Sequence, residues 1–414
     1  NVTAIFTRAG EEGWGHFAAV KLTVAPQQVM ALDDVVATLM ETSGVGQLEF
    51  LGDTDALIIT SRTYTKVTTG GPGTYGQFIP AVATTDATTL ADVPHILSTA
   101  DFRTNLGFAE VNGSDGTVRV TLFDAASGSV VSQHDYPIVP FTQMQFPATG
   151  AALMTAELQV ISGDARIVAY GSVIDNHSGD PIYVAASRPQ EGPFVAPVIS
   201  QPGINTLWRS EVVISAFGES GGSFDLTYVD SVTAERLTKH GVLAPNQAVR
   251  IDDVVGSYFG RPNAFGTVRA DLPSNLVATS RTFTTSSNGT YGQFIPFTPA
   301  GEGFAPLAPG GAAREVLHVE HSPAFRTNAG AINTGGSDAL IRFSLFDAAG
   351  QLLGSTDRTV GPLQAVQFPI DVLTSSAFVD GRLEVQMLSG SRGAVAWASV
   401  IDNATGDPIF VPVQ

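Results

Sequence analysis

The octapeptide Gly-Thr-Tyr-Gly-Gln-Phe-Ile-Pro at Gly73–Pro80 is repeated letter for letter at Gly289–Pro296. Long-period duplication is more typical of an array of scaffold modules than of an enzyme. Three further motifs recur in the same order, which indicates duplication with small insertions and deletions: Phe-Arg-Thr-Asn at Phe102–Asn105 and Phe325–Asn328, Leu-Phe-Asp-Ala-Ala at Leu122–Ala126 and Leu345–Ala349, and Ser-Val-Ile-Asp-Asn at Ser172–Asn176 and Ser399–Asn403.

A fainter repeat divides each copy into halves. The stretch that opens at Trp208-Arg209 and the stretch that opens at Phe325 share an Asp-containing turn, a Pro-x-Gln step, an Asp-Val pair and a final segment ending in Pro. Each half has about 100 residues, a common domain size. We therefore predict four modules at residues 1–86, 94–187, 198–299 and 314–414, with Pro- and Gly-rich joins at 187–193 and 298–303.

The first module is incomplete at its front. Val2–Phe6 aligns with Phe224–Tyr228, so the counterpart of Ile204–Gly222 has no equivalent. A sandwich that lacks strands exposes sheet edges, and another chain can supply the missing strand. We expect such strand complementation of module 1, or assembly of copies into a homo-oligomer or filament.

The segments between turns have the pattern of β-strands. Val118–Phe123 and Ile341–Phe346 alternate polar and apolar residues, and both are followed by Asp- and Gly-containing turns. Leu32–Glu41 is the one segment with a helical pattern, and Asp252–Tyr258 is its counterpart. We predict an all-β fold of four tandem immunoglobulin-like β-sandwiches joined end to end, arranged as two copies of a two-module unit.

Composition narrows the class of protein. Lys and Arg total 21 against 39 Asp and Glu, and the net charge of −18 argues against a nucleic-acid partner or an anionic membrane surface. Cysteine is absent, which excludes thiolate chemistry and is compatible with secretion. No run of 18 apolar residues is present, so no membrane span is expected. A processed export signal would leave a first residue other than Met, as here, and we expect an extracellular or cell-surface location.

The motifs resemble an uncharacterised tandem repeat module of secreted bacterial proteins. The resemblance covers almost the whole chain and rests on Ser-Arg-Thr-Tyr at Ser61–Tyr64, the Gly-Thr-Tyr-Gly-Gln-Phe-Ile-Pro octapeptides, Phe-Arg-Thr-Asn, and the Ser-Val-Ile-Asp-Asn segments followed by Gly-Asp-Pro-Ile. It implies export and a non-catalytic accessory or surface role, and it transfers no catalytic, cofactor-binding or metal-binding residues.

Two sets of residues could imitate a metal site. His318-Val319-Glu320-His321 is the only close histidine pair, but residues three apart on a strand point to opposite faces, and the aligned segment at His95 keeps one histidine. Asp175–Asp180 and Asp402–Asp407 could offer oxygens to calcium, but their spacing is not that of a twelve-residue calcium loop. We interpret the first set as an ordinary strand and the second as hydrogen-bonded turns, and predict no metal and no cofactor.

Arginine and aromatic residues could form binding sites for an anionic partner or for sugars. The arginines could bind an anionic partner, but in a chain of this charge each is expected to pair with a carboxylate of its own module. The aromatic residues could stack on sugars, with packing as the default. The arginines are Arg62, Arg103, Arg209, Arg281 and Arg326, and the aromatic residues are Tyr75, Tyr291, Trp14, Trp208 and Trp397, of which Trp397 is expected to fill a core.

No catalytic motif is present. The sequence has no nucleophile elbow, phosphate-binding loop, dinucleotide fingerprint or zinc-protease motif. Adjacent carboxylates at Asp33-Asp34 and Asp252-Asp253 are expected to be caps rather than an acid–base pair. We predict no enzyme and no catalytic residue. The expected function is a rod-like stalk, or a filament or sheath subunit that assembles through strand edges, and the alternative is a set of carbohydrate-binding or adhesion modules.

Overall fold

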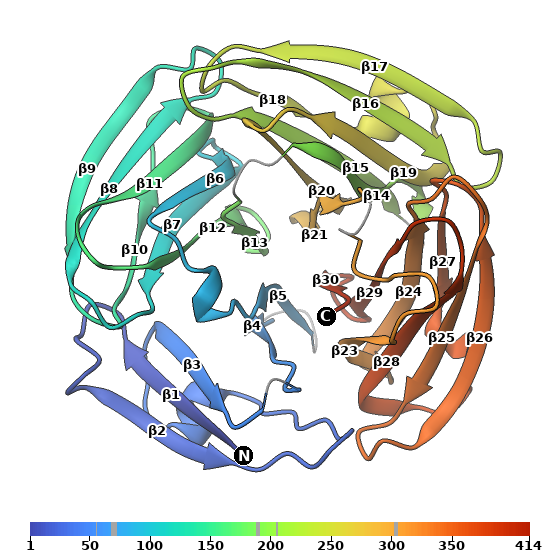
Figure 1. Cartoon of the computed structure of the whole chain (residues 1–414), viewed down its shortest axis with the longest axis horizontal. Coiled ribbons are helices and arrows are strands. Elements are labelled where there is room, and N and C mark those ends of the chain that lie inside the picture. Colours follow the sequence, from blue (N-terminus) through green and yellow to red (C-terminus); the bar gives the residue numbers. More distant parts are fainter. Residues whose placement is uncertain (55, 68–72, 188–190, 204–205, 302–304) are drawn as a thin grey trace.

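Antiparallel strands make up nearly all of the regular structure, as predicted. The computed structural model describes residues 1–54, 56–67, 73–187, 191–203, 206–301 and 305–414. The strands fall into four groups that surround a common axis (Figure 1), and we call these groups modules 1 to 4 in chain order.

Module 2 is a sandwich of two four-stranded sheets. The axial sheet has the order β10-β7-β12-β13 and the peripheral sheet has the order β6-β11-β8-β9, and the core between them is apolar. The strands are β6 (Leu90–Leu97), β7 (Phe102–Glu110), β8 (Gly116–Asp124), β9 (Val130–Ile138), β10 (Gln143–Ala148), β11 (Leu153–Gly163), β12 (Ile167–Asp175) and β13 (Pro181–Ala185).

Module 4 repeats this topology. Its axial sheet has the order β27-β24-β29-β30 and its peripheral sheet has the order β23-β28-β25-β26. Trp397 of β29 is 1% exposed and fills a core, as expected from the sequence. The strands are β23 (Arg314–His321), β24 (Phe325–Asn333), β25 (Ala339–Phe346), β26 (Leu352–Val360), β27 (Ala365–Pro369), β28 (Phe378–Ser389), β29 (Ala394–Asp402) and β30 (Pro408–Pro412), with a 3-10 turn η4 (Ile370–Val372).

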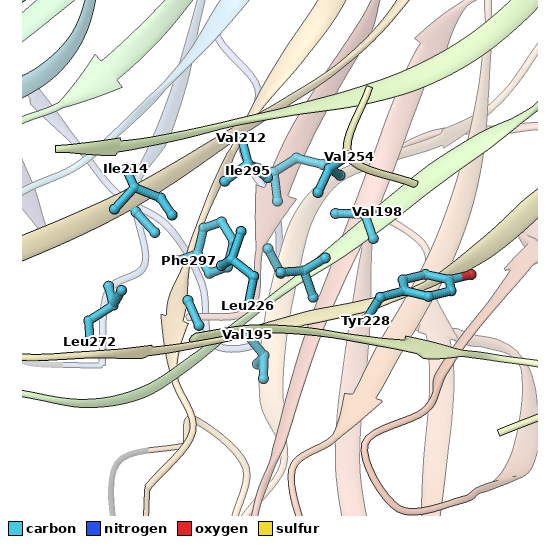
Figure 2. Close-up of a cluster of buried hydrophobic side chains, with 14 of the residues drawn as sticks. Val195, Val198, Val212, Ile214, Leu226, Tyr228, Val254, Leu272, Ile295 and Phe297 are labelled. Carbon is cyan, nitrogen blue, oxygen red and sulfur yellow. The ribbon is translucent and has the colours of Figure 1, made fainter. Parts of the chain in front are cut away.

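In module 3 one long strand joins the two layers. β14 (Gly192–Gly203) pairs with β19 in the peripheral layer, and its last residues pair with β15 (Thr206–Ala216) in the axial layer. Valine and isoleucine side chains of both strands fill the core (Figure 2). The other elements are β16 (Gly222–Asp230), β17 (Arg236–Leu243), β18 (Ala248–Ile251), the π-helical turn η3 (Val254–Tyr258), β19 (Ala264–Leu272), β20 (Leu276–Ser286), β21 (Gly289–Pro296) and β22 (Thr298–Pro299).

Module 1 has five strands, which confirms that it is incomplete. One sheet has the order β2-β1-β3 and the other contains β4 and β5 alone, and the described residues include no counterpart of β14 or β15 in this module. The elements are β1 (Val2–Arg8), β2 (Phe17–Leu22), the π-helical turn η1 (Val35–Leu39), β3 (Gly46–Gly52), β4 (Thr60–Lys66) and β5 (Thr74–Pro80). The predicted helical segment is this short turn.

The expectation of modules strung end to end as a rod is wrong, because the four modules close into a ring. One strand of each module lies near the axis, where β5 contacts β13, β13 contacts β21, β21 contacts β30, and β30 contacts β5 (Figure 1). Phe78 of β5 packs against the core of module 4, and Phe294 of β21 packs against the core of module 2. Burial of these side chains against neighbouring modules favours the closed arrangement over an extended one.

The joins between modules are not simply linkers. β14 begins at Gly192, inside the join predicted at 187–193, and residues 188–190 of that join lie outside the described residues. The join predicted at 298–303 contains β22, and its residues 302 and 303 lie outside the described part of the chain. The join after β5 contains the 3-10 turn η2 (Thr84–Asp86).

Candidate functional sites at the ring axis and at the open edge of module 1

The Asp-Asn-x-x-Gly-Asp turns bind the neighbouring module at the axis. Asp175 Oδ1 accepts hydrogen bonds from the backbone N–H groups of His177 at 2.8 Å and Ser178 at 2.9 Å. Its Oδ2 accepts from the backbone N–H of Thr290 at 2.9 Å and from the Thr290 hydroxyl at 2.7 Å. One carboxylate oxygen is therefore held by donors of module 2 and the other by donors of module 3, so this turn joins two modules.

The second copy of the turn makes the same contacts between modules 4 and 1. Asp402 Oδ2 accepts from the backbone N–H of Thr74 at 2.8 Å and from its hydroxyl at 2.9 Å. The hydroxyl of Thr405 donates to the carbonyl of Thr74 at 2.8 Å, as Ser178 does to the carbonyl of Thr290 at 2.7 Å. The repeated motifs thus encode matched joints on opposite sides of the ring.

A pair of buried carboxyl groups lies where these joints meet. Asp180 Oδ2 accepts from the backbone N–H of Gly292 at 2.8 Å, and Asp407 Oδ2 accepts from Gly76 at 2.9 Å. Both side chains are fully buried. Their Oδ1 atoms receive no hydrogen bond from an N–H or hydroxyl group of the described residues, and the two carboxyl groups lie against each other. Because a carboxylate only accepts, this contact requires a proton on one member of the pair.

Two arginines flank the carboxyl pair. Arg62 Nη2 lies 3.4 Å from Asp407 Oδ2, and Arg281 Nη2 lies 4.0 Å from Asp180 Oδ2. We call these four residues (Arg62, Asp180, Arg281 and Asp407) the axial hub. The expectation that Arg62 and Arg281 pair within their own modules is wrong, because each carboxylate partner belongs to an adjacent module that ring closure brings into reach.

Burial controls the protonation of the hub. Loss of water raises the pKa of Asp180 to about 7, although the charge of Arg281 opposes this shift. Burial, followed by repulsion from Asp180, raises the pKa of Asp407 well above its ordinary value, against the charge of Arg62. The pair therefore keeps a proton well above the pH at which an exposed aspartate loses it.

The tyrosines of the two octapeptides meet at a hollow next to the hub. The hollow has a volume of about 630 Å³ and lies between modules 1, 2 and 3. Tyr75 and Tyr291 are half-buried in its wall. A Cβ added at Gly179 would lie 3.2 Å from the Tyr75 ring, which shows how closely this ring approaches the neighbouring turn. The described lining residues are Val67, Tyr75, His177, Ser178, Ser287, Asn288, Gly289 and Tyr291.

The open edge of module 1 is a second candidate site. β3 pairs with β1 and β4 pairs with β5, and no further strand of the described residues pairs with either. In module 3 the corresponding strands β19 and β20 are paired on both sides. The same Ser-Arg-Thr sequence is fully buried at Ser280–Thr282 but half-buried to exposed at Ser61–Thr63. The same three residues are therefore more exposed in module 1, where the described residues add no strand beside β4 other than β5.

Modules 1 and 3 are each contacted by an equivalent histidine of a neighbouring module, His318 and His95 respectively. His95 of module 2 has its Nε2 atom 3.0 Å from Glu211 Oε1 of β15, and both side chains are fully buried. Burial opposes ionisation of Glu211, but the hydrogen bond of His95 and the charges of Arg250 and Arg281 lower its pKa to about 2. Arg250 Nη2 donates to Glu211 Oε2 at 2.6 Å and completes this buried ion cluster.

The corresponding histidine of module 4 lacks such a partner. His318 and His95 adopt the same left-handed backbone conformation, each with φ of 59°, and His318 lies against module 1, where its ring contacts Phe78. The Nε2 atom of His318 is buried and finds no partner among the described residues. Burial and the nearby charge of Arg62 lower the pKa of His318. The strand that carries Glu211 in module 3 has no counterpart among the described residues of module 1.

The histidine pair at His318–His321 and two of the remaining arginines form no ligand site among the described residues. His318, Glu320 and His321 belong to no group of three possible metal ligands in the described part of the chain. Arg103 and Arg326 donate to the amide oxygens of Asn176 and Asn403 within their own modules, at 2.7 and 2.8 Å.

Two further predictions concern the adjacent carboxylates and an exposed tryptophan. Asp253 caps η3 by accepting from the Gly256 N–H at 2.8 Å, whereas Asp34 forms no such bond at η1. Trp14 is 65% exposed and packs edge-on against Phe141 of module 2.

Within the described residues, no helix has the length and apolar character needed to cross a membrane.

Sequence reasoning found the residues of the axial hub but not their arrangement. The Asp turns and the Ser-Arg-Thr strands are recognisable as repeats because each occurs in both halves of the sequence. Their meeting at the axis depends on ring closure between segments more than a hundred residues apart in sequence, as for Asp180 and Gly292. The sequence around His318 predicts an ordinary strand, and nothing in it indicates that the ring packs against Phe78 of module 1 with a buried Nε2 atom that has no partner among the described residues.

Comparison with known proteins gives little further information. No protein-family model matches the chain, and no curated protein matches it. One solved structure, described as the tetra-tandem repeat in the extending region of a large adhesion protein, aligns with 99% of this chain and 89% of its own length. The identity is 12% and the TM-score is 0.11, and a likeness at this level carries no argument about function.

Proposed function

We propose that this chain is a non-catalytic, extracellular structural protein: a ring-shaped scaffold of the cell surface that assembles with partners through the open strand edges of module 1. The observation that carries the proposal is the contrast between modules 1 and 3. Equivalent strands are paired on both sides in module 3 and on one side in module 1. Unpaired edges are templates for strand addition.

The open edges carry few of the devices that usually block strand addition, and these are the charged side chains of Glu49, Arg62 and Lys66. Neither β3 nor β4 contains a proline or a described bulge, and the only lysine is Lys66 at the end of β4. Leu51 of β3 is 60% exposed. An exposed apolar residue on an unpaired edge favours association over a monomer in water.

The axial hub does not supply an active site in this proposal. Its carboxyl groups are fully buried and engaged by Gly76, Gly292 and each other. A general acid or base must lie within hydrogen-bond reach of a substrate atom, and a group enclosed by its own chain does not meet that condition. The hub therefore supports a role in holding the modules together.

The test is the size of the purified chain in solution. Sedimentation velocity over a wide concentration range should show association that is lost when lysine is placed on both edges by Leu51→Lys and Thr63→Lys. Val232→Lys is the matched control, because Val232 is 90% exposed in a turn of module 3. A chain that stays monomeric at high concentration, and captures no strand-donating partner from culture medium, would contradict the proposal.

The hollow at the axis favours a second candidate, adhesion to carbohydrate. Two tyrosine rings beside serine, asparagine and histidine side chains form the mixture of apolar and polar groups that sugars bind. Retention on insoluble polysaccharides that falls at least tenfold in the Tyr75→Ala and Tyr291→Ala double variant would support it. Equal retention of the double variant and the parent chain would reject the hollow as the binding site.

A further inference from the structure

The open edge of module 1 has the shape and chemistry of a site for one particular occupant. We propose that it binds a β-hairpin with the pattern of Gly192–Ala216, supplied by a polypeptide segment outside residues 1–414, and that an acidic residue of this hairpin pairs with His318. This inference rests on the proposed function, in that it names the partner which the open edges take.

The template for the occupant is present in the same chain. In module 3, β14 pairs with β19 and β15 pairs with β20, so one hairpin completes both layers of the sandwich. Val195 and Val198 of β14, with Val212 and Ile214 of β15, are fully buried in the core (Figure 2). In module 1, β3 and β4 are the counterparts of β19 and β20 and lack that hairpin.

The apolar surface that the hairpin would cover is exposed in module 1. η3 lies against β14 and β15, and its Val254 and Val255 are fully buried. η1 has the same Asp-Asp-Val-Val lead-in, but none of its residues is buried. Met30 and Leu32, which precede η1, are 44% and 40% exposed. Covering these residues gives the association a hydrophobic driving force of the kind that already stabilises module 3.

The unpartnered Nε2 atom of His318 indicates the charge of the occupant. His95 meets Glu211 of β15, and the equivalent His318 presents a buried Nε2 atom that has no partner among the described residues. Arg281, which favours ionised Glu211, has Arg62 as its counterpart beside His318. A carboxylate at the Glu211 position of the incoming strand would satisfy both groups, whereas an apolar residue would leave the histidine unsatisfied at a free-energy cost.

Module 1 differs from module 3 at one position that would contact the carboxylate of the occupant. Ala31 stands in module 1 where module 3 has Arg250, the second donor to Glu211. The carboxylate of the occupant would therefore depend on His318 and Arg62 alone. The loss on removing the histidine is expected to be larger at module 1 than the loss on replacing His95 in module 3.

The test uses the full chain and a synthetic peptide that copies residues 192–216. Binding is measured by calorimetry, and the imidazole of His318 is followed by NMR titration with and without peptide. We expect saturable one-to-one binding and a rise of the His318 pKa toward or above its ordinary value when the carboxylate arrives. The E211Q peptide should bind at least tenfold more weakly and should not raise this pKa, and a peptide of scrambled sequence is the control for apolar adsorption.

A double-mutant cycle separates a specific pair from general packing. If Glu211 of the peptide pairs with His318, the H318Q chain should lose the distinction between the parent and E211Q peptides, whereas H134Q should retain it. A chain that carries residues 192–222 ahead of Asn1 provides a second measurement. It should unfold at a higher temperature than the parent chain and should no longer bind the peptide, because the fused hairpin occupies the edge.

The outcomes distinguish this inference from the proposed function. Absence of peptide binding together with a fused chain that gains no stability would overturn the hairpin inference. Binding of both peptides with equal affinity would overturn the assignment of His318. If the chain nevertheless assembles, and Leu51→Lys with Thr63→Lys abolishes assembly, then the proposed function stands and the partner is of another kind.

Discussion

At the scale of the residue, equivalent arginines are buried to different extents in the two halves of the ring. Arg281 is 3% exposed at the side chain, and its counterpart Arg62 is 13% exposed. Each donates to a threonine hydroxyl of its own octapeptide, at 2.7 Å to Thr290 and 2.9 Å to Thr74. A buried guanidinium is stable only where such donors and carboxylates meet it, and the axis is where the sequence provides both.

The shared proton of the hub makes stability depend on pH. Burial first raises the pKa of Asp180 to about 7, and burial together with repulsion from Asp180 raises that of Asp407, whereas unfolded aspartates titrate near the ordinary value of 3.8. The folded state therefore holds more protons between these values. The free energy of unfolding contributed by the pair is fully present below about pH 4. It falls as pH rises toward 7, by up to about 1.4 kcal/mol per pH unit for one retained proton.

Asp407→Asn tests this dependence. The amide keeps the shape of the carboxyl group and removes the proton that titrates, so the variant should show a flatter decline of unfolding free energy between pH 4.5 and 7 than the parent chain. Chemical denaturation at several pH values measures the difference, and the exposed Asp338→Asn variant should follow the parent. Identical slopes for the parent and Asp407→Asn would show that the carboxyl pair retains no proton.

At the scale of the element, the equivalent turns η1 and η3 differ in burial according to the strands that cover them. η3 and η1 share the Asp-Asp-Val-Val lead-in, yet Val254 is fully buried under β14 and β15 while Val35 is half-buried. The sequence of the turn is thus compatible with both environments. Its burial depends on strands that lie elsewhere in the chain.

Truncation of these two valines should have unequal effects. Val254→Ala leaves a cavity in a closed core, and we expect a loss of about 2 kcal/mol in unfolding free energy. Val35→Ala should cost under about 0.5 kcal/mol, because its side chain already contacts solvent. Thermal and denaturant unfolding measure both changes. In the presence of the 192–216 peptide, the cost of Val35→Ala should rise toward that of Val254→Ala, and a large cost without peptide would contradict the exposure of η1.

At the scale of the whole molecule, the ring is held by two matched joints and a shared centre. The turn of module 2 binds module 3 through Asp175, and the turn of module 4 binds module 1 through Asp402. The hydroxyls of Ser172 and Ser399 donate to the side-chain oxygens of Gln77 and Gln293 across the other two boundaries. Each copy of the octapeptide therefore contributes to two contacts between modules, one through its threonine and one through its glutamine.

The sequence by itself determined the all-β class, the duplication, and the incomplete first module. Alternating residues such as Val118–Phe123 bury one face of a strand whatever its neighbours are, and a missing segment is visible in any aligned repeat. Only the tertiary structure decided that the modules form a ring, that Asp180 meets Asp407, and that the Nε2 atom of His318 is buried without a partner among the described residues. The physical reason is that these contacts join surfaces of different modules, so their energies depend on how modules pack and not on any local pattern.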